Sequence, residues 1–170
     1  RPFLETADTI KTIECYDISH FAGKEAVGAM TTLVHNDGAW KARPERFRKF
    51  RIKETPTRDD PRMIAEILRR RLRHSEWPYP DLVVIDGGIT QYEVAKKALD
   101  HFFPNLESKK SNLKPKIISF AKPHQEVIGR LPNGVTPAVI ERIIEQTHRF
   151  VVNYHRRLRQ RQFLRSGQLG

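Results

Sequence analysis

The sequence contains a single cysteine, Cys15, among its 170 residues. An intrachain disulfide is therefore excluded, and so is a structural zinc site built on pairs of cysteines. No apolar run approaches the roughly 18 residues that a membrane span requires, and no secretory signal peptide is visible. A nucleotide P-loop and the Gly-x-Ser-x-Gly motif of hydrolases are also missing. We expect a protein of a reducing, cytoplasmic compartment with no membrane partner.

Negative charge is scarce as well. The chain has 20 acidic and 31 Lys or Arg residues, a net charge of +11, and a pI of about 10.1. This excess indicates a polyanionic partner, with nucleic acid as the first candidate. With 38% hydrophobic and 30% charged residues, the composition is globular, and the length suits one domain with a real core. Because the chain starts at Arg1, we expect a piece of a longer protein.

The basic residues fall into three clusters. Residues 41–53 hold seven Lys or Arg and one acid, residues 69–73 hold four arginines, and residues 147–170 hold six arginines and no acid. Any one run could be a solvated face of an ordinary domain. Three such runs on one basic chain favour a surface that faces phosphates.

Hydrophobic periodicity predicts strands that are followed by alternating helices and strands. The predicted strands are 12–17, 26–34, 47–52, 82–85 and 116–121, with a hairpin turn at 35–38. The predicted helices start at about residues 59, 88 and 137 and end at about 72, 103 and 158. The order β-β-β-α-β-α-β-α predicts an α/β fold with one mixed five-stranded sheet and helices packed on it. This order occurs in ribonuclease H-like folds, among a few others.

Two aspartates stand at the ends of predicted strands. Asp17 follows the apolar residues of the first strand, and Asp86 ends the most hydrophobic one. If these strands are neighbours, their carboxyl ends meet in one crevice, where bare carboxylates about 4 Å apart would repel by roughly 1–4 kcal/mol. A shared proton or a cation would offset this, and oxygen ligands suit Mg²⁺ or Mn²⁺. The alternative is that Asp86 caps the following helix.

His148 is a third candidate, because it lies on a predicted helix in the most basic part of the chain. A lone histidine is more often an ordinary surface or core residue than a ligand. The same holds for His20, His124 and His155. The Asp59-Asp60 pair also has an ordinary interpretation as the start of a helix.

Four segments, in order, resemble a known family. They are IECYDISH from Ile13, FRKFRIK with the Asp59-Asp60 helix start, PDLVVIDGG followed by Gln91, and THRFVVNYHRRLR from Thr147. Together they are similar to the C-terminal endonuclease domain of UvrC, the incising subunit of bacterial nucleotide-excision repair. The resemblance covers about residues 13–161.

The resemblance implies a ribonuclease H-like nuclease with a catalytic Asp17, Asp86 and His148 set, which would also hold Mg²⁺ or Mn²⁺. Asp60 is implicated as a further functional residue. The family domain nicks the damaged strand of double-stranded DNA on the 5′ side of a lesion, within a complex that contains UvrB. On this basis we expect a linker over 1–11, a monomeric nuclease domain over 12–162, and from 163 the start of a linker toward a helix-hairpin-helix region.

Cations from the three clusters and one loop are expected to hold the DNA backbone without reading bases. They are Arg48, Lys49, Arg51, Arg70, Lys122, Arg149, Arg156, Arg157 and Arg159. Some positions depart from the family: Ile89-Thr90 stand where Lys-Gly is usual, and Gln146 stands where Glu is common. These departures keep two alternatives open, a non-catalytic DNA-binding scaffold and another ribonuclease H-like enzyme such as a resolvase or an RNA-cleaving nuclease.

Overall fold

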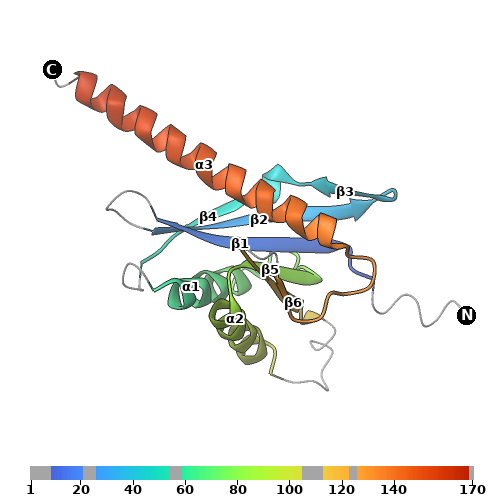
Figure 1. The fold of residues 1–170 in the computed structure, drawn as a ribbon. Helices are drawn as coiled ribbons and strands as arrows, with labels where there is room; N and C mark the ends of the chain where they lie inside the picture. The colour runs from blue at the N-terminus through green and yellow to red at the C-terminus, as the bar shows by residue number, and fades with distance from the viewer. Residues whose placement is uncertain (1–8, 21–25, 54–58, 105–112, 123–125, 169–170) are drawn as a thin grey trace, which may run out of the picture.

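The computed structural model describes residues 9–20, 26–53, 59–104, 113–122 and 126–168. A single twisted sheet lies in the middle, with the long helix α3 across one face and helices α1 and α2 on the other (Figure 1). Among the described residues, no helix combines the length and the apolar character needed to cross a membrane.

The elements follow the predicted order. The strands are β1 (Thr12–His20), β2 (Ala26–Asn36), β3 (Ala39–Ala42), β4 (Arg48–Arg51), β5 (Leu82–Asp86), β6 (Lys116–Ala121) and β7 (Glu126–Ile128). The helices are the short 3₁₀ turn η1 (Pro44–Arg46), then α1 (Asp60–Leu72), α2 (Ile89–Phe102) and α3 (Pro137–Gln168). The sheet runs β3-β2-β1-β5-β6-β7, and β4 also pairs with β2. β1, β5 and β6 are parallel, and the other pairings are antiparallel.

All five predicted strands and all three helices are present, but the sheet has seven strands rather than five. The additional strands β3 and β7 span four and three residues, too few for a hydrophobic period to be recognised. β3 forms the second arm of the predicted hairpin. Its turn contains Asp37 and Gly38 at φ values of 52° and 78°, the left-handed conformation that Asp-Gly tolerates.

Helix α3 is longer than predicted, because it continues to Gln168 instead of ending near Leu158. The added residues are mostly Arg, Gln, Leu and Phe, and no proline interrupts them. Good helix formers therefore extend the helix into solvent without packing. The helix passes residue 162, the expected end of the domain, without a break. The expected domain limits themselves stay predictions.

Side chains alternate between the two faces of the central strands and build two cores. Ile13 and Cys15 of β1 pack with Ile140, Ile143 and Ile144 of α3, together with other buried residues. Tyr16, the residue after Cys15, packs with the buried faces of α1 and α2 on the opposite side. This two-residue period decides which side chains of β1 and β5 face α3.

Candidate active site

The parallel pairing of β1 and β5 brings the two predicted aspartates together. Tyr16 is opposite Ile85 in this pair, so Asp17 and Asp86 are the next residues on their strands. Each lies two positions beyond a residue of the α3-side core, Cys15 on β1 and Val84 on β5. Both carboxylates therefore belong to the face of the sheet that α3 covers, at the carboxyl ends of neighbouring parallel strands.

Both carboxylates have raised pKa values. Burial, and then the charge of Asp86, raise the pKa of Asp17 to about 7, with a smaller contribution from Asp60; Lys122 opposes the shift. Burial also raises the pKa of Asp86, and the positive charges of Lys122 and His148 oppose that rise. At neutral pH the site thus holds an acid that is readily protonated beside a second carboxylate.

Asp86 does not cap helix α2, so the alternative that this residue is only a helix cap is wrong. The N-cap of α2 is Gly88, and no side chain caps the helix. The turn between strand and helix is held from β6 instead, because the Ser119 hydroxyl donates to the carbonyls of Ile85, at 3.2 Å, and Gly87. The Asp86 carboxylate is therefore left for the site.

Helix α3 brings His148 to the same place. The preceding residue, Thr147, is fully buried, and its hydroxyl is 2.6 Å from that of Thr31 on β2 and donates to the Ile143 carbonyl at 2.7 Å. These contacts fix the rotation of the helix over the sheet. His148 is exposed and borders a surface pocket of about 340 Å³ with Asp17. The pocket is completed by Ile18, Ser19, His20, Val151, Val152, His155, Arg156 and Arg159.

Two histidines of the pocket, His20 and His155, make side-chain contacts of their own, one of them with the predicted residue Asp60. His20 Nε2 is 2.8 Å from a carboxylate oxygen of Asp60, the first residue of α1. The Ser19 hydroxyl is 3.1 Å from Nε2 of His155. The sequence reasoning gave His155 no specific role, although its spacing of seven residues from His148 places both on one side of a helix. His124 lies outside the described residues.

The donor set at the strand ends consists of carboxylate oxygens. Within the described ranges, no three His, Cys, Asp or Glu side chains form a group that could hold a metal ion. His148 shares the pocket with Asp17, and its expected role as a third ligand stays a prediction. Two neighbouring carboxylates with raised pKa values, of which Asp17 lines the pocket, still fit Mg²⁺ or Mn²⁺, because these hard cations take oxygen ligands and complete their shell with water or substrate phosphate.

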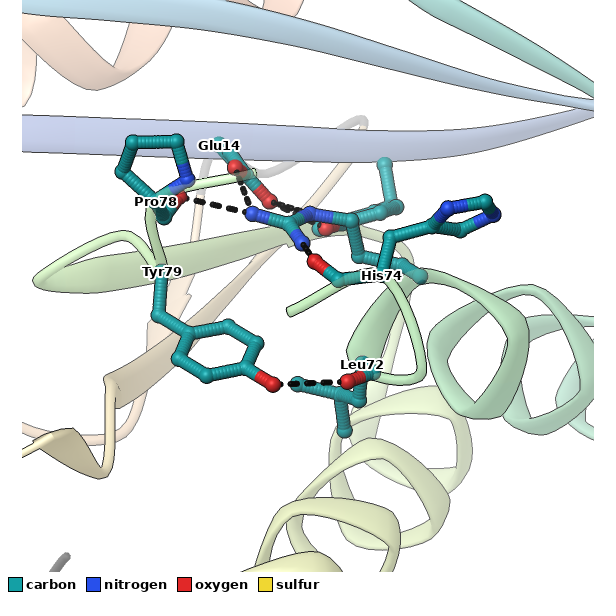
Figure 2. Close-up of polar contacts among 7 residues, drawn as sticks. Glu14, Leu72, His74, Pro78 and Tyr79 are labelled. Atoms are coloured by element: carbon teal, nitrogen blue, oxygen red, sulfur yellow. Dashed lines mark hydrogen bonds and ion pairs between the residues drawn. The ribbon is translucent and has the colours of Figure 1, made fainter. Parts of the chain in front are cut away.

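One arginine of the second basic cluster is not available to DNA. Arg71 is 1% exposed, and its guanidinium donates to both carboxylate oxygens of Glu14, at 2.9 and 2.8 Å. The same group also donates to the carbonyls of Pro78 and His74, and the Tyr16 hydroxyl donates to Glu14 at 2.5 Å (Figure 2). Composition alone could not separate this buried ion pair, which joins β1 to α1, from its exposed neighbours.

Most of the cations expected to bind DNA lie at the surface. Exposed positions are those of Lys49, Arg51, Lys122, Arg149, Arg156, Arg157 and Arg159. Arg48 is half-buried, 4.5 Å from the centre of the Trp77 ring, and Arg70 contacts Glu66 and the carbonyl of Arg51. Their DNA contacts stay predictions. Of the departures from the family pattern, Ile89 is 53% exposed at the start of α2.

A second pocket of about 470 Å³ lies between α1 and α2, on the other side of the sheet. Its floor is apolar, with Ala65, Leu72, Val94 and Phe102, and none of its lining residues is acidic. It is larger than the pocket at Asp17, but it holds none of the predicted catalytic residues. The smaller, more polar pocket is therefore the candidate active site.

Comparison with known proteins identifies the family. The model of the UvrC RNase H endonuclease domain matches residues 1–161. The UvrABC system protein C of Chlorobium phaeobacteroides is 36% identical over 161 residues, which cover 92% of this chain and 24% of that protein. The protein of the same name from Trichlorobacter lovleyi is 33% identical over 181 residues, 92% of this chain and 28% of that protein. The chain thus spans about a quarter of the length of these curated relatives.

Solved nuclease structures show a more distant likeness. A Ciona intestinalis endonuclease V, in complex with a 24mer DNA containing an inosine followed by a ribo-adenosine, has a TM-score of 0.43 and 16% identity, over 85% of this chain and 57% of that one. Thermus thermophilus RuvC has a TM-score of 0.36 and 12% identity, over 65% of this chain and 61% of that one. The family match over nearly the whole chain confirms the ribonuclease H-like fold class, and the chain belongs to the UvrC RNase H endonuclease domain family.

Proposed function

We propose that this domain hydrolyses a phosphodiester bond of DNA in a reaction that depends on a divalent metal. The observation that carries the proposal is the convergence of Asp17 and Asp86 at the ends of β1 and β5, with the pKa of Asp17 raised to about 7. Two half-buried acids that repel one another destabilise a fold, so their position is typical of a functional site. The arginine-rich helix beside them suits a nucleic-acid backbone.

Asp17 and Asp86 would hold Mg²⁺ or Mn²⁺. When bound at such a site, the ion lowers the pKa of water and screens the negative charge of the phosphate. His148 lies at the pocket next to the acids, where it would donate a proton to the leaving oxygen or accept one from water. Lys122, whose charge acts on both acids, would contact the phosphate.

The biological setting follows from the relatives rather than from this chain. We infer that the domain nicks the damaged strand 5′ of a lesion during nucleotide-excision repair in the cytoplasm. Its relatives carry the name of the UvrABC system, and the chain covers about a quarter of their length. A complex with UvrB would accordingly use regions beyond this domain, and the domain itself would be monomeric.

The experiment compares Asp17→Asn and Asp86→Asn with Asp37→Asn as the matched control. Asp37 lies in the exposed β2–β3 turn, where asparagine also accepts a positive φ, so the same chemical change there leaves the site intact. Cleavage of a bubble-containing duplex in Mn²⁺ should fall by about 10²-fold or more in both site variants and stay unchanged in the control. DNA binding should stay within a few-fold in all three.

The rival functions give different results in the same assay. A DNA-binding scaffold would show no Mn²⁺-dependent cleavage in the wild-type protein, at any enzyme concentration. An RNA-cleaving enzyme would cut an RNA–DNA hybrid in preference to the bubble duplex. Full activity in both site variants would remove the catalytic assignment of the two acids.

A further inference from the structure

The C-terminal half of α3 leaves the body of the protein. In Figure 1 the helix crosses the sheet obliquely and extends past its edge. Each described side chain after Leu158 is exposed, so this part of the helix buries none of its side chains in the core. A long exposed helix rich in arginine lacks a folding role and is therefore free to meet a ligand.

The cations of this half lie on opposite sides of the helix. Arg156 and Arg159 border the pocket with His148 and His155. Arg157 follows His148 by nine residues, about two and a half helical turns, and so lies on the other side. Arg161, one turn further, is on the same side as Arg157. The helix thus carries two rows of positive charge, back to back.

The second row lies on the side of α3 where Lys49 of β4 contacts the helix. Lys49 Nζ is 4.1 Å from the centre of the Tyr154 ring, which holds the ammonium group against α3. Burial, and then the charges of Arg157 and Arg161, lower the pKa of Lys49. Among the described residues, none of these three cations forms an ion pair with a carboxylate. Three cations gathered in this way favour the binding of a phosphate.

The first row leads into the active site. The pocket that contains Asp17 also contains Arg156 and Arg159, so a DNA strand whose phosphate lies at the acids would continue along this side of α3. One strand cannot also reach Lys49 on the far side of the helix. The second row therefore requires a second strand.

The spacing of the rows matches double-stranded DNA. An α-helix with its side chains is about 10–12 Å across, and the major groove of B-DNA is about 12 Å wide and admits a helix. We propose that the projecting half of α3 lies in the major groove next to the cut site, with the cut strand on the Arg156 and Arg159 side and the uncut strand on Lys49, Arg157 and Arg161. This inference rests on the proposed function, because it takes the cut strand from the site at Asp17.

The test replaces one phosphate at a time with an uncharged methylphosphonate, in either strand of a short fluorescent duplex. Binding is measured by anisotropy in Ca²⁺, so cleavage is not needed. We expect the wild-type protein to be sensitive at positions in both strands that face one another across the major groove. The variant Arg157→Gln/Arg161→Gln should lose the sensitivity in one strand, and Arg156→Gln/Arg159→Gln in the other.

The matched control is Lys96→Gln/Lys97→Gln, which removes two exposed charges from α2 on the opposite side of the sheet. The control should keep both sets of contacts. In each α3 variant, the slope of log binding constant against log salt concentration should become less steep by about 0.9 per lost phosphate contact. Sensitivity confined to one strand in the wild type, or an equal loss in both strands for either α3 variant, would overturn the groove assignment. Failure to cleave DNA would overturn the proposed function instead and leave these binding patterns interpretable.

Discussion

Asp17 lowers the free energy of unfolding at neutral pH. Its carboxyl is half-buried next to Asp86, and its pKa of about 7 lies above the value near 3.9 of an unfolded chain. The folded state therefore holds a proton that the unfolded state has lost between about pH 4 and 7. Across this range the free energy of unfolding falls as pH rises, and above pH 7 the loss is complete.

Replacing this acid should therefore stabilise the protein. At pH 8, Asp17→Asn should raise the free energy of unfolding by about 1–3 kcal/mol. A shift of about three units at about 1.4 kcal/mol each would give roughly 4 kcal/mol, and the value is smaller because the carboxyl is partly exposed to solvent. Near pH 4 the variant and the wild type should be equally stable. Urea denaturation at both pH values measures the difference. A gain of the same size at both pH values, or in Asp37→Asn at pH 8, would contradict the account.

The buried Glu14–Arg71 pair should behave in the opposite way. Among the described residues, Arg71→Met leaves the interior Glu14 carboxylate with the Tyr16 hydroxyl as its one remaining side-chain partner, so the free energy of unfolding should fall by about 3–5 kcal/mol. The double variant Glu14→Gln/Arg71→Met removes the unpaired charge and keeps an acceptor for Tyr16. It should recover more than half of that loss in urea denaturation, and a double variant less stable than Arg71→Met would show that the pair is not coupled in this way.

At this scale, the sequence predicted residues that a strand pattern can position. The positions of Asp17 and Asp86 could be predicted because each follows an apolar strand, and the ends of neighbouring parallel strands lie together. The burial of Arg71 could not be predicted, because its partner Glu14 is 57 residues away and both look like ordinary charged residues in the sequence. The Ser19–His155 contact joins β1 to α3 over 136 residues and was equally hidden.

Among the elements, helix α3 consists of a part that packs on the sheet and a part that is exposed. Its first half packs on the sheet through Ile140, Ile143 and Ile144 and orients His148, while the side chains of residues 159–167 are exposed. The prediction of its start was right because the apolar period is clear there. Its end was placed too early because an exposed helix has no apolar period, and only packing or a breaker would have marked the boundary.

A chain that ends at Leu158 tests whether the packed part of α3 is sufficient for stability and the exposed part contributes to DNA binding. It should unfold at nearly the same temperature as the full chain, because the deleted residues bury nothing within the described structure. The slope of log binding constant against log salt concentration should become less steep by up to about 3. This follows because Arg159, Arg161 and Arg165 are removed, and each phosphate contact contributes about 0.9 to the slope. Thermal unfolding and binding at several salt concentrations measure both quantities. A large fall in melting temperature would contradict the division of the helix.

Across the whole molecule, the sheet separates two surfaces of different character. The face under α3 holds the acids, the histidines and the rows of arginine, and the opposite face holds the apolar pocket between α1 and α2. The net charge of +11 predicted a polyanionic partner, but not that the cations would flank a pair of acids. That arrangement depends on the parallel order of β1 and β5, which composition does not contain.

The central claim is that Asp17 and Asp86 form one cation-binding site, and Mn²⁺ binding tests it most directly. Titration of the protein with Mn²⁺, followed by electron paramagnetic resonance of the free ion, should show a bound ion in the wild type and in Asp37→Asn. Both Asp17→Asn and Asp86→Asn should lose that ion, because each removes half of the carboxylate donors. Equal Mn²⁺ binding in all four proteins, or loss in only one of the two site variants, would contradict a shared site.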